Sequence, residues 1–298
     1  MAKILLVHPL FLAESPAEQA SASPYFPLGI LYLAAYVREH GHDVSIFDAT
    51  FARDRAAFDT ALAEAEADLV GISCLGPTRS TALELAERAS ATGALVVAGG
   101  PDPTADPLPY LNGPAVDVVV HQEGEQTILA ILDHLDRGLD DVAALRDEPG
   151  IALRLDGQVV VNQPRPPIDN LDALPLPARD LIDMDRYLDH WDATNGYRSL
   201  TISTSRGCPY HCRWCVDAVH GSDFRQRSPA NVAAEVKALT ATYDVGRLRM
   251  VDDVDGIERS WFEQWAASAD DLGAALPFEA LNDLERQDLP LLDVRDSL

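Results

Sequence analysis

The chain has 298 residues, of which 47% are hydrophobic and 24% are charged, a balance typical of a globular protein large enough for two domains. Its formal net charge of −25 predicts repulsion from polyphosphates, so we expect no nucleic-acid partner. The N-terminal apolar run Ile4–Val7 is too short for a signal peptide, and no later run approaches a transmembrane span. We therefore expect a cytoplasmic protein without a membrane partner.

Residues 1–138 alternate short apolar runs with amphipathic segments. The runs are β-branched and have the length of buried parallel strands; they are Ile4–Val7, Val44–Phe47, Leu69–Ser73, Leu95–Ala98 and Val116–Val120. Three amphipathic segments stop at Gly41, Gly93 and Gly138, as helices do when a glycine follows the last turn. Strands with intervening helices predict a doubly wound parallel α/β sheet of the Rossmann-like type, which we assign to residues 1–138.

Residues 139–199 are expected to join two domains. Ile151–Leu155 and Gln158–Val161 alternate around Asp156-Gly157, a pair that predicts a hairpin turn. Two proline-rich stretches follow, and they are typical of an extended linker.

A second α/β pattern covers residues 200–298. The strand Leu200–Thr204 leads directly into a cysteine-rich loop, and Ser228 and Pro229 predict the start of a helix that ends near Tyr243. A second strand, a second helix and a short third strand follow over residues 247–281. A full barrel of eight such units needs about 250 residues, so we expect an incomplete (β/α) barrel. Either the chain is truncated, or it is half of a split protein whose barrel a partner chain completes.

The loop after Leu200–Thr204 holds three of the four cysteines, Cys208, Cys212 and Cys215. Three thiolates on one loop can converge on a metal centre, and three rather than four protein ligands leave a position open for a substrate or cofactor. The alternative is a zinc site completed by His211 or His220. The fourth cysteine, Cys74, follows an apolar run and is expected to be a small buried side chain.

The segment Arg206–Cys215 resembles the signature of the radical S-adenosylmethionine superfamily. The match includes the cysteine spacing, Arg206-Gly207 before the loop, Pro209, and Trp214 before the third cysteine. The resemblance implies that the cysteines hold a 4Fe-4S cluster and that S-adenosylmethionine binds its open iron. Reduction by an electron donor would then yield a 5′-deoxyadenosyl radical, with Trp214 near the adenine.

The same resemblance implies that polar groups after the second barrel strand bind the methionine moiety. Asp252 and Asp253 stand at that position and would accept hydrogen bonds from its ammonium group, while Arg227 or Arg225 would meet its carboxylate. The alternative for all four is a solvated surface position.

The loops after the N-terminal strands contain neither G-x-G-x-x-G nor a Walker A motif, so a dinucleotide or nucleoside triphosphate is not favoured. The order of the two regions resembles the cobalamin-binding class of the superfamily. The matching fragments are Pro27–Gly29, Gly71–Ser73, Gly99–Pro101, Glu123–Glu125 and Leu174–Asp180. The resemblance implies a cobalamin site at Ser73, Leu75, Gly76, Thr78, Gly99, Gly100, Pro101, Glu123, Gly124 and Glu125. The Asp-x-His-x-x-Gly loop of other cobalamin proteins is absent, so His8 is not assigned to cobalt.

The function implied is a radical enzyme that methylates, cyclises or rearranges an unactivated carbon in a small-molecule substrate. No side chain is assigned as a catalytic acid or base. One alternative is a radical S-adenosylmethionine enzyme without cobalamin. Another is a truncated, non-catalytic binding protein or half of a split protein.

Overall fold

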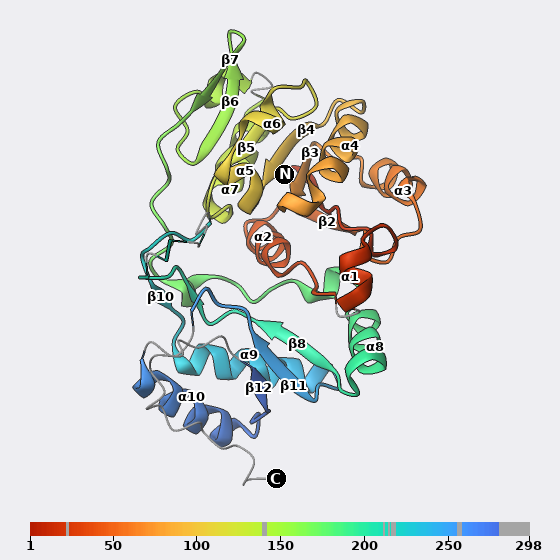
Figure 1. The fold of residues 1–298 in the computed structure, drawn as a ribbon. Coiled ribbons are helices and arrows are strands. Elements are labelled where there is room, and N and C mark those ends of the chain that lie inside the picture. The colour runs from red at the N-terminus through yellow and green to blue at the C-terminus, as the bar shows by residue number, and fades with distance from the viewer. Residues whose placement is uncertain are drawn as a thin grey trace. The chain divides into compact units, whose positions relative to one another are not determined.

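The structure is a computed structural model that describes residues 1–21, 24–138, 142–210, 212–213, 215, 219–254 and 258–279 (Figure 1). It divides into two compact units. The first consists of the described residues of Met1–Ile168, Pro175–Asp183 and Ala218–His220, and the second of those of Asp169–Leu174, Met184–Asp217 and Gly221–Leu298. No helix in these described ranges is both long and apolar enough to span a bilayer.

The first unit is built on a seven-stranded sheet with the strand order β2-β1-β3-β4-β5-β6-β7. The strands are β1 (Lys3–His8), β2 (Asp43–Asp48), β3 (Leu69–Ser73), β4 (Leu95–Gly99), β5 (Val118–Val120), β6 (Ile151–Leu155) and β7 (Gln158–Val161). Strands β1 to β5 pair in parallel. This order confirms the predicted doubly wound parallel sheet.

Both faces of this sheet are covered by helices. The main ones are α2 (Leu28–Glu39), α3 (Arg55–Ala65), α4 (Arg79–Ser90) and α7 (Glu125–Asp136); the short ones are η1 (Leu12–Glu14), α1 (Pro16–Ser21), η2 (Gly76–Thr78), α5 (Pro101–Ala105), α6 (Leu108–Leu111) and η3 (Val142–Leu145). Leu5 and Val7 pack in one apolar cluster with residues of α3 and α4. Ile4 and Leu6 pack in the other with residues of α2 and α7. Burial on both faces explains why β1 is continuously apolar.

The segment Ile151–Val161, which we expected to belong to the region between the domains, forms the edge of the sheet. β6 pairs antiparallel with β5 and then with β7. Asp156 and Gly157 both have positive φ, as the predicted hairpin turn requires. The hairpin joins the sheet because Ile151, Ala152 and Leu153 are fully buried and give β5 an apolar neighbour.

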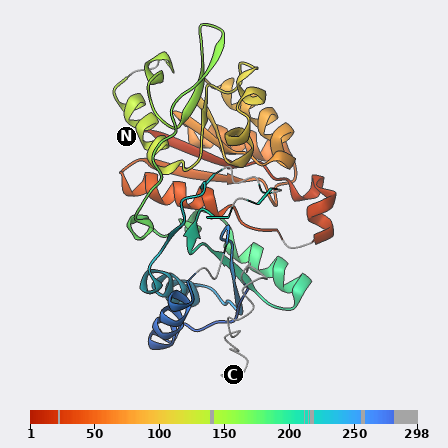
Figure 2. The same cartoon turned by 60° about the vertical axis from the view of Figure 1, so that its left-hand side comes forward.

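The second unit contains a three-stranded parallel sheet with the order β12-β11-β8. Its elements are η4 (Leu171–Ala173), α8 (Met184–Asn195), β8 (Ser199–Ile202), β9 (Ser205–Arg206), β10 (Arg225–Gln226), α9 (Pro229–Thr242), β11 (Arg247–Met250), α10 (Arg259–Leu272) and β12 (Phe278–Glu279), while η5 (Arg179–Leu181) belongs to the first unit. Helices α9 and α10 lie side by side in both views (Figures 1 and 2). The alternation of parallel strands and helices confirms the predicted first βα units of a barrel.

Helices α9 and α8 of this unit differ in how far the sequence predicts them. The Ser228 hydroxyl accepts a hydrogen bond from the Asn231 amide and Pro229 begins α9, as predicted. Helix α8 was not predicted. It buries Met184, Tyr187, Leu188 and Trp191 on one face, inside a segment that we expected to be linker.

Candidate functional site

The cysteine loop follows β9 in the second unit. None of its cysteines forms a disulfide; Cys208 is half-buried, and Cys212 and Cys215 are exposed. The Cys208 amide donates to the Gly221 carbonyl (3.1 Å) and the Cys215 amide to the Cys212 carbonyl (3.1 Å). Trp214 and His211 lie outside the described residues. Among the residues that are described, no three His, Cys, Asp or Glu side chains are grouped as a metal site.

The two ends of the loop are held together at Gly207. Strand β9 pairs antiparallel with β10, so Arg206 lies opposite Arg225. Gly207 has a φ of +82°, and a Cβ atom there would lie 2.4 Å from the Asp223 carbonyl oxygen. Only glycine fits this close approach without displacing the backbone. The glycine of the cysteine motif is therefore required by the closure of the loop.

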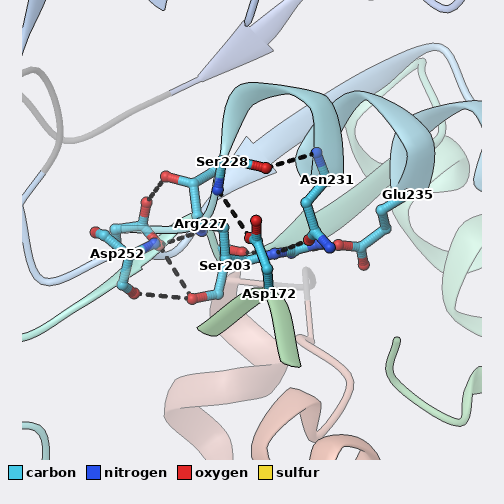
Figure 3. Close-up of polar contacts among 9 residues, drawn as sticks. Asp172, Ser203, Arg227, Ser228, Asn231, Glu235 and Asp252 are labelled. Atoms are coloured by element: carbon cyan, nitrogen blue, oxygen red, sulfur yellow. Dashed lines mark hydrogen bonds and ion pairs between the residues drawn. The ribbon is translucent and has the colours of Figure 1, made fainter. Parts of the chain in front are cut away.

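Asp252, predicted to contact S-adenosylmethionine, is buried against the segment before the loop (Figure 3). Its carboxylate accepts hydrogen bonds from the Ser203 hydroxyl (3.1 Å), the Thr204 amide (2.7 Å) and the Ser205 amide (3.0 Å), and also from the Thr204 hydroxyl. Asp253 is exposed, and its carboxylate accepts from the Gly207 amide (3.1 Å).

Arg227, the second predicted contact of the methionine moiety, forms a buried ion pair with Glu235 (2.5 Å). Its guanidinium also donates to the Asn231 side chain (2.7 Å) and to the Ser203 carbonyl (2.8 Å) (Figure 3). Arg225 is half-buried, and its Nε atom donates to the Asp223 carbonyl (3.1 Å). Asp252 and Arg227 thus contact the polypeptide itself, and their predicted ligand roles stay predictions.

In the first unit, the loops after β3 and β4 are joined by an ion pair. The Arg79 guanidinium donates twice to the Asp102 carboxylate (2.7 Å each), and the Tyr110 hydroxyl donates to the same carboxylate (2.5 Å). The hydrogen bond from Arg79 lowers the pKa of Asp102, and burial raises that of Tyr110. Burial also raises the pKa of Cys74 to about 12, which leaves it protonated and unsuited to bind a metal, in contrast to the accessible loop cysteines.

Several of the residues predicted to contact cobalamin contact other residues of this unit. The Thr78 hydroxyl accepts from the Leu75 amide and donates to the Leu75 carbonyl (3.1 Å each). A Cβ at Gly100 (φ +107°) would lie 2.8 Å from the Cys74 carbonyl oxygen. The Glu123 carboxylate accepts from the Ile168 amide (2.8 Å).

The other predicted contacts divide by exposure. Leu75, Gly76 and Pro101 are exposed; Ser73, Gly99 and Gly124 are half-buried; and Glu125 is buried. The exposed residues all follow β3 or β4, at the carboxyl ends of parallel strands where such sheets bind ligands. They are the predicted contacts that the structure leaves open to a ligand.

Two buried histidines at the same edge of the sheet were not predicted as site residues. His8 ends β1 and His121 follows β5. Within the described part of the chain, neither Nε2 atom has a hydrogen-bond partner. Burial lowers the pKa of both imidazoles, so both are neutral near pH 7. A histidine as the last residue of a buried strand, or directly after one, was the signal that could have identified them.

Comparison with known proteins identifies a family model that matches part of the first unit. Residues 19–132 match the model of the B12 binding domain. This range includes α2, strands β2 to β5 and most of α7, together with the loops that follow β3 and β4.

Two curated relatives match most of the chain. An uncharacterized methyltransferase of Pyrococcus horikoshii is 34% identical over 257 residues, which are 84% of this chain and 53% of the relative. The anaerobic magnesium-protoporphyrin IX monomethyl ester cyclase of Synechocystis is 27% identical over 87% of this chain and 50% of its own length. The chain spans about half the length of these relatives.

A solved structure shares the fold. The cobalamin-dependent S-adenosylmethionine radical enzyme OxsB, solved with aqua-cobalamin and S-adenosylmethionine bound, superimposes with a TM-score of 0.76. The match covers 93% of this chain and 38% of OxsB at 18% sequence identity.

Proposed function

The chain belongs to the cobalamin-binding class of the radical S-adenosylmethionine superfamily, and from this membership we propose that it works as a radical enzyme with three cofactors. These are a 4Fe-4S cluster, S-adenosylmethionine and cobalamin. The reaction is the methylation, cyclisation or rearrangement of an unactivated carbon in a small-molecule substrate. Its cytoplasmic location and its need for an electron donor are part of the same proposal.

The observation that carries the proposal is the contrast among the four cysteines. Cys208, Cys212 and Cys215 form no disulfide and are half-buried or exposed, on a loop whose base is closed by Gly207. Cys74 is buried with a strongly raised pKa. Thiolates are the ligands of iron–sulfur clusters, so these three loop residues would hold the cluster. When bound, the cluster would supply the electron that cleaves S-adenosylmethionine.

Cobalamin binding is supported by the carboxyl edge of the first sheet. Leu75 (43% exposed), Gly76 and Pro101 offer an accessible, largely apolar surface there, and Leu108 is 49% exposed on the neighbouring helix α6. A flat macrocycle needs such a surface together with a few polar groups. The neutral, buried imidazoles of His8 and His121 have an unpartnered nitrogen within the described part of the chain and would supply such groups.

Anaerobic reconstitution with iron and sulfide tests the cluster. We expect stoichiometric iron and sulfide and a reduced-cluster electron paramagnetic resonance signal. Replacing Cys208, Cys212 or Cys215 by alanine should abolish both, while Cys74→Ala, the matched control, should retain them. A colourless protein that holds one zinc ion would contradict the proposal.

Cobalamin binding is tested separately by titrating aqua-cobalamin and following its visible absorbance. We expect saturable binding at micromolar concentration, unchanged in the cysteine variants. A protein that assembles the cluster but retains no cobalamin would instead support the alternative of a radical S-adenosylmethionine enzyme that works without cobalamin.

A further inference from the structure

The five residues Ser203–Gly207, here called the pre-loop segment, connect β8 to Cys208 and decide where the cysteine loop begins. This segment is held by side chains from two parts of the chain that are distant in sequence. Asp252 and Asp253 follow β11, and Arg227 precedes α9. Each of them forms a hydrogen bond with a backbone amide or carbonyl of the segment.

The buried Asp252 carboxylate accepts four hydrogen bonds from this segment. A carboxylate offers about four lone-pair positions for hydrogen bonds. Asp252 receives four donors, from Ser203, from Ser205 and, twice, from Thr204, and its residue is only 4% exposed. The Oδ1 atom accepts three of these bonds and the Oδ2 atom one, so the carboxylate of this buried residue is engaged mainly by the chain itself.

Arg227 holds the same segment by donating hydrogen bonds to two of the segment's carbonyl groups. Its guanidinium donates to the Ser203 carbonyl and its amide to the Thr204 carbonyl (2.8 Å each). The guanidinium is fixed in turn by Glu235 and Asn231. The Arg227 carbonyl accepts from the Trp261 indole (2.7 Å), which ties this contact to α10. The Thr204 and Ser205 amides are thus bound by a carboxylate, and the Ser203 carbonyl by a guanidinium from a different part of the chain (Figure 3).

From these contacts we infer that Asp252, together with Asp253 and Arg227, positions the backbone from which Cys208 extends and does not contact S-adenosylmethionine. Asp252 fixes Thr204 and Ser205, and Asp253 fixes the amide of Gly207, the neighbour of Cys208. Ligands placed on a backbone that is held in this way keep their geometry when a centre binds. The consequence for a cluster rests on the proposed function, whereas the role in positioning the segment does not.

Amide hydrogen exchange in the cofactor-free protein tests the inference directly. Asp252→Ala should speed exchange at Thr204 and Ser205 by about tenfold or more, because hydrogen bonds to a charged group are lost. Asp252→Asn keeps one acceptor oxygen and should restore much of the protection. Asp271→Asn, an exposed substitution of equal charge on α10, is the control and should change nothing. Ser203→Ala removes a single donor and serves if Asp252→Ala fails to fold; it should speed exchange within the pre-loop segment alone.

Cluster spectroscopy separates positioning from ligand binding. If Asp252 positions the loop, Asp252→Ala loses iron on reconstitution, while Asp252→Asn binds iron and still shows the spectral change on adding S-adenosylmethionine. The inference would be overturned if Asp252→Asn had the amide exchange rates and the iron content of the wild type but lost the spectral change on adding S-adenosylmethionine. A wild-type protein that assembles no cluster, yet shows the exchange difference, would reject the proposed function and retain the inference.

Discussion

The two units hold the carboxyl ends of their strands by different means. In the first, β3 and β4 lie within a seven-stranded sheet whose two faces are buried under separate apolar clusters. The ion pair between Arg79 and Asp102 links their loops at a partly exposed position. In the second, β8 and β11 belong to a three-stranded sheet, and buried charged groups, Asp252 and the pair Arg227–Glu235, connect the segments that follow.

This difference predicts how strongly the stability of each unit depends on its charged side chains. A wide sheet buried on both faces fixes its strand ends through apolar packing, so an ion pair at its edge adds little. A narrow sheet has less apolar area for this purpose, and here buried hydrogen-bonded charges fix the backbone. Removing one member of such a pair leaves the other charge buried without its partner, which is costly. We therefore expect substitutions of these charged residues to lower the free energy of unfolding more in the second unit than in the first.

Arg227→Met tests this difference with the largest expected effect. It leaves Glu235, whose side chain is 1% exposed, without the guanidinium, and should lower the free energy of unfolding of the second unit by about 3–5 kcal/mol. All four tryptophans, Trp191, Trp214, Trp261 and Trp265, lie in the sequence of this unit. Urea unfolding followed by tryptophan fluorescence therefore reports on it selectively.

The matched control is Arg259→Met, which breaks an exposed ion pair with Glu263 in the same unit. Exposed pairs contribute about 0.5 kcal/mol, so this variant should unfold almost as the wild type does. Equal losses in the two variants would remove the distinction between buried and exposed charges on which the comparison of the units depends.

Gly207→Ala has the next largest expected effect. The added Cβ meets the Asp223 carbonyl oxygen at 2.4 Å in a backbone with positive φ, so we expect a loss of about 3 kcal/mol and weaker cluster assembly. Gly196→Ala is the control, because Gly196 has a similar φ of +77° but no atom within 4 Å of the added Cβ. It should cost about 1 kcal/mol, from the backbone conformation alone. Equal costs would show that the close approach at Gly207 is relieved easily.

Features set by local sequence were predicted well. The apolar runs placed the strands of both units, Asp156-Gly157 placed a turn, and Ser228 placed the start of α9. Helix α8 was not predicted although Met184, Tyr187, Leu188 and Trp191 have helical spacing, because Pro175 and Pro177 shortly before it favour an extended chain.

The partners of the charged site residues could not be predicted from local sequence. Asp252 lies 48 residues from Thr204, and Arg227 lies 24 residues from Ser203. A charged residue after a strand is compatible with a ligand, a solvated turn or a buried internal contact, and only the fold decides among them. The resemblance to a family identified the cysteines, but it could not show that Asp252 accepts hydrogen bonds from Ser203, Thr204 and Ser205.

The smallest expected effect is in the first unit, where Asp102→Asn removes the charge that pairs with Arg79. The pKa of Asp102 is lowered in the folded protein, chiefly by the hydrogen bond from Arg79. A lowered pKa gives stability that is present above the unfolded value of about 3.9 and is lost as the pH falls through the folded value. The variant should therefore be less stable than the wild type by about 1 kcal/mol at pH 7, and the difference should shrink below about pH 4.

Urea unfolding followed by far-ultraviolet circular dichroism at the two pH values measures this difference, with Asp133→Asn, an exposed substitution on α7, as the control. A pH-independent difference would mean that the ion pair contributes nothing and that the hydrogen bond from Tyr110 accounts for the whole effect. A loss at pH 7 as large as that of Arg227→Met would mean that the strand ends of the first unit depend on charge as much as those of the second. The comparison between the two units would then fail, because apolar packing would not be what fixes the loops after β3 and β4.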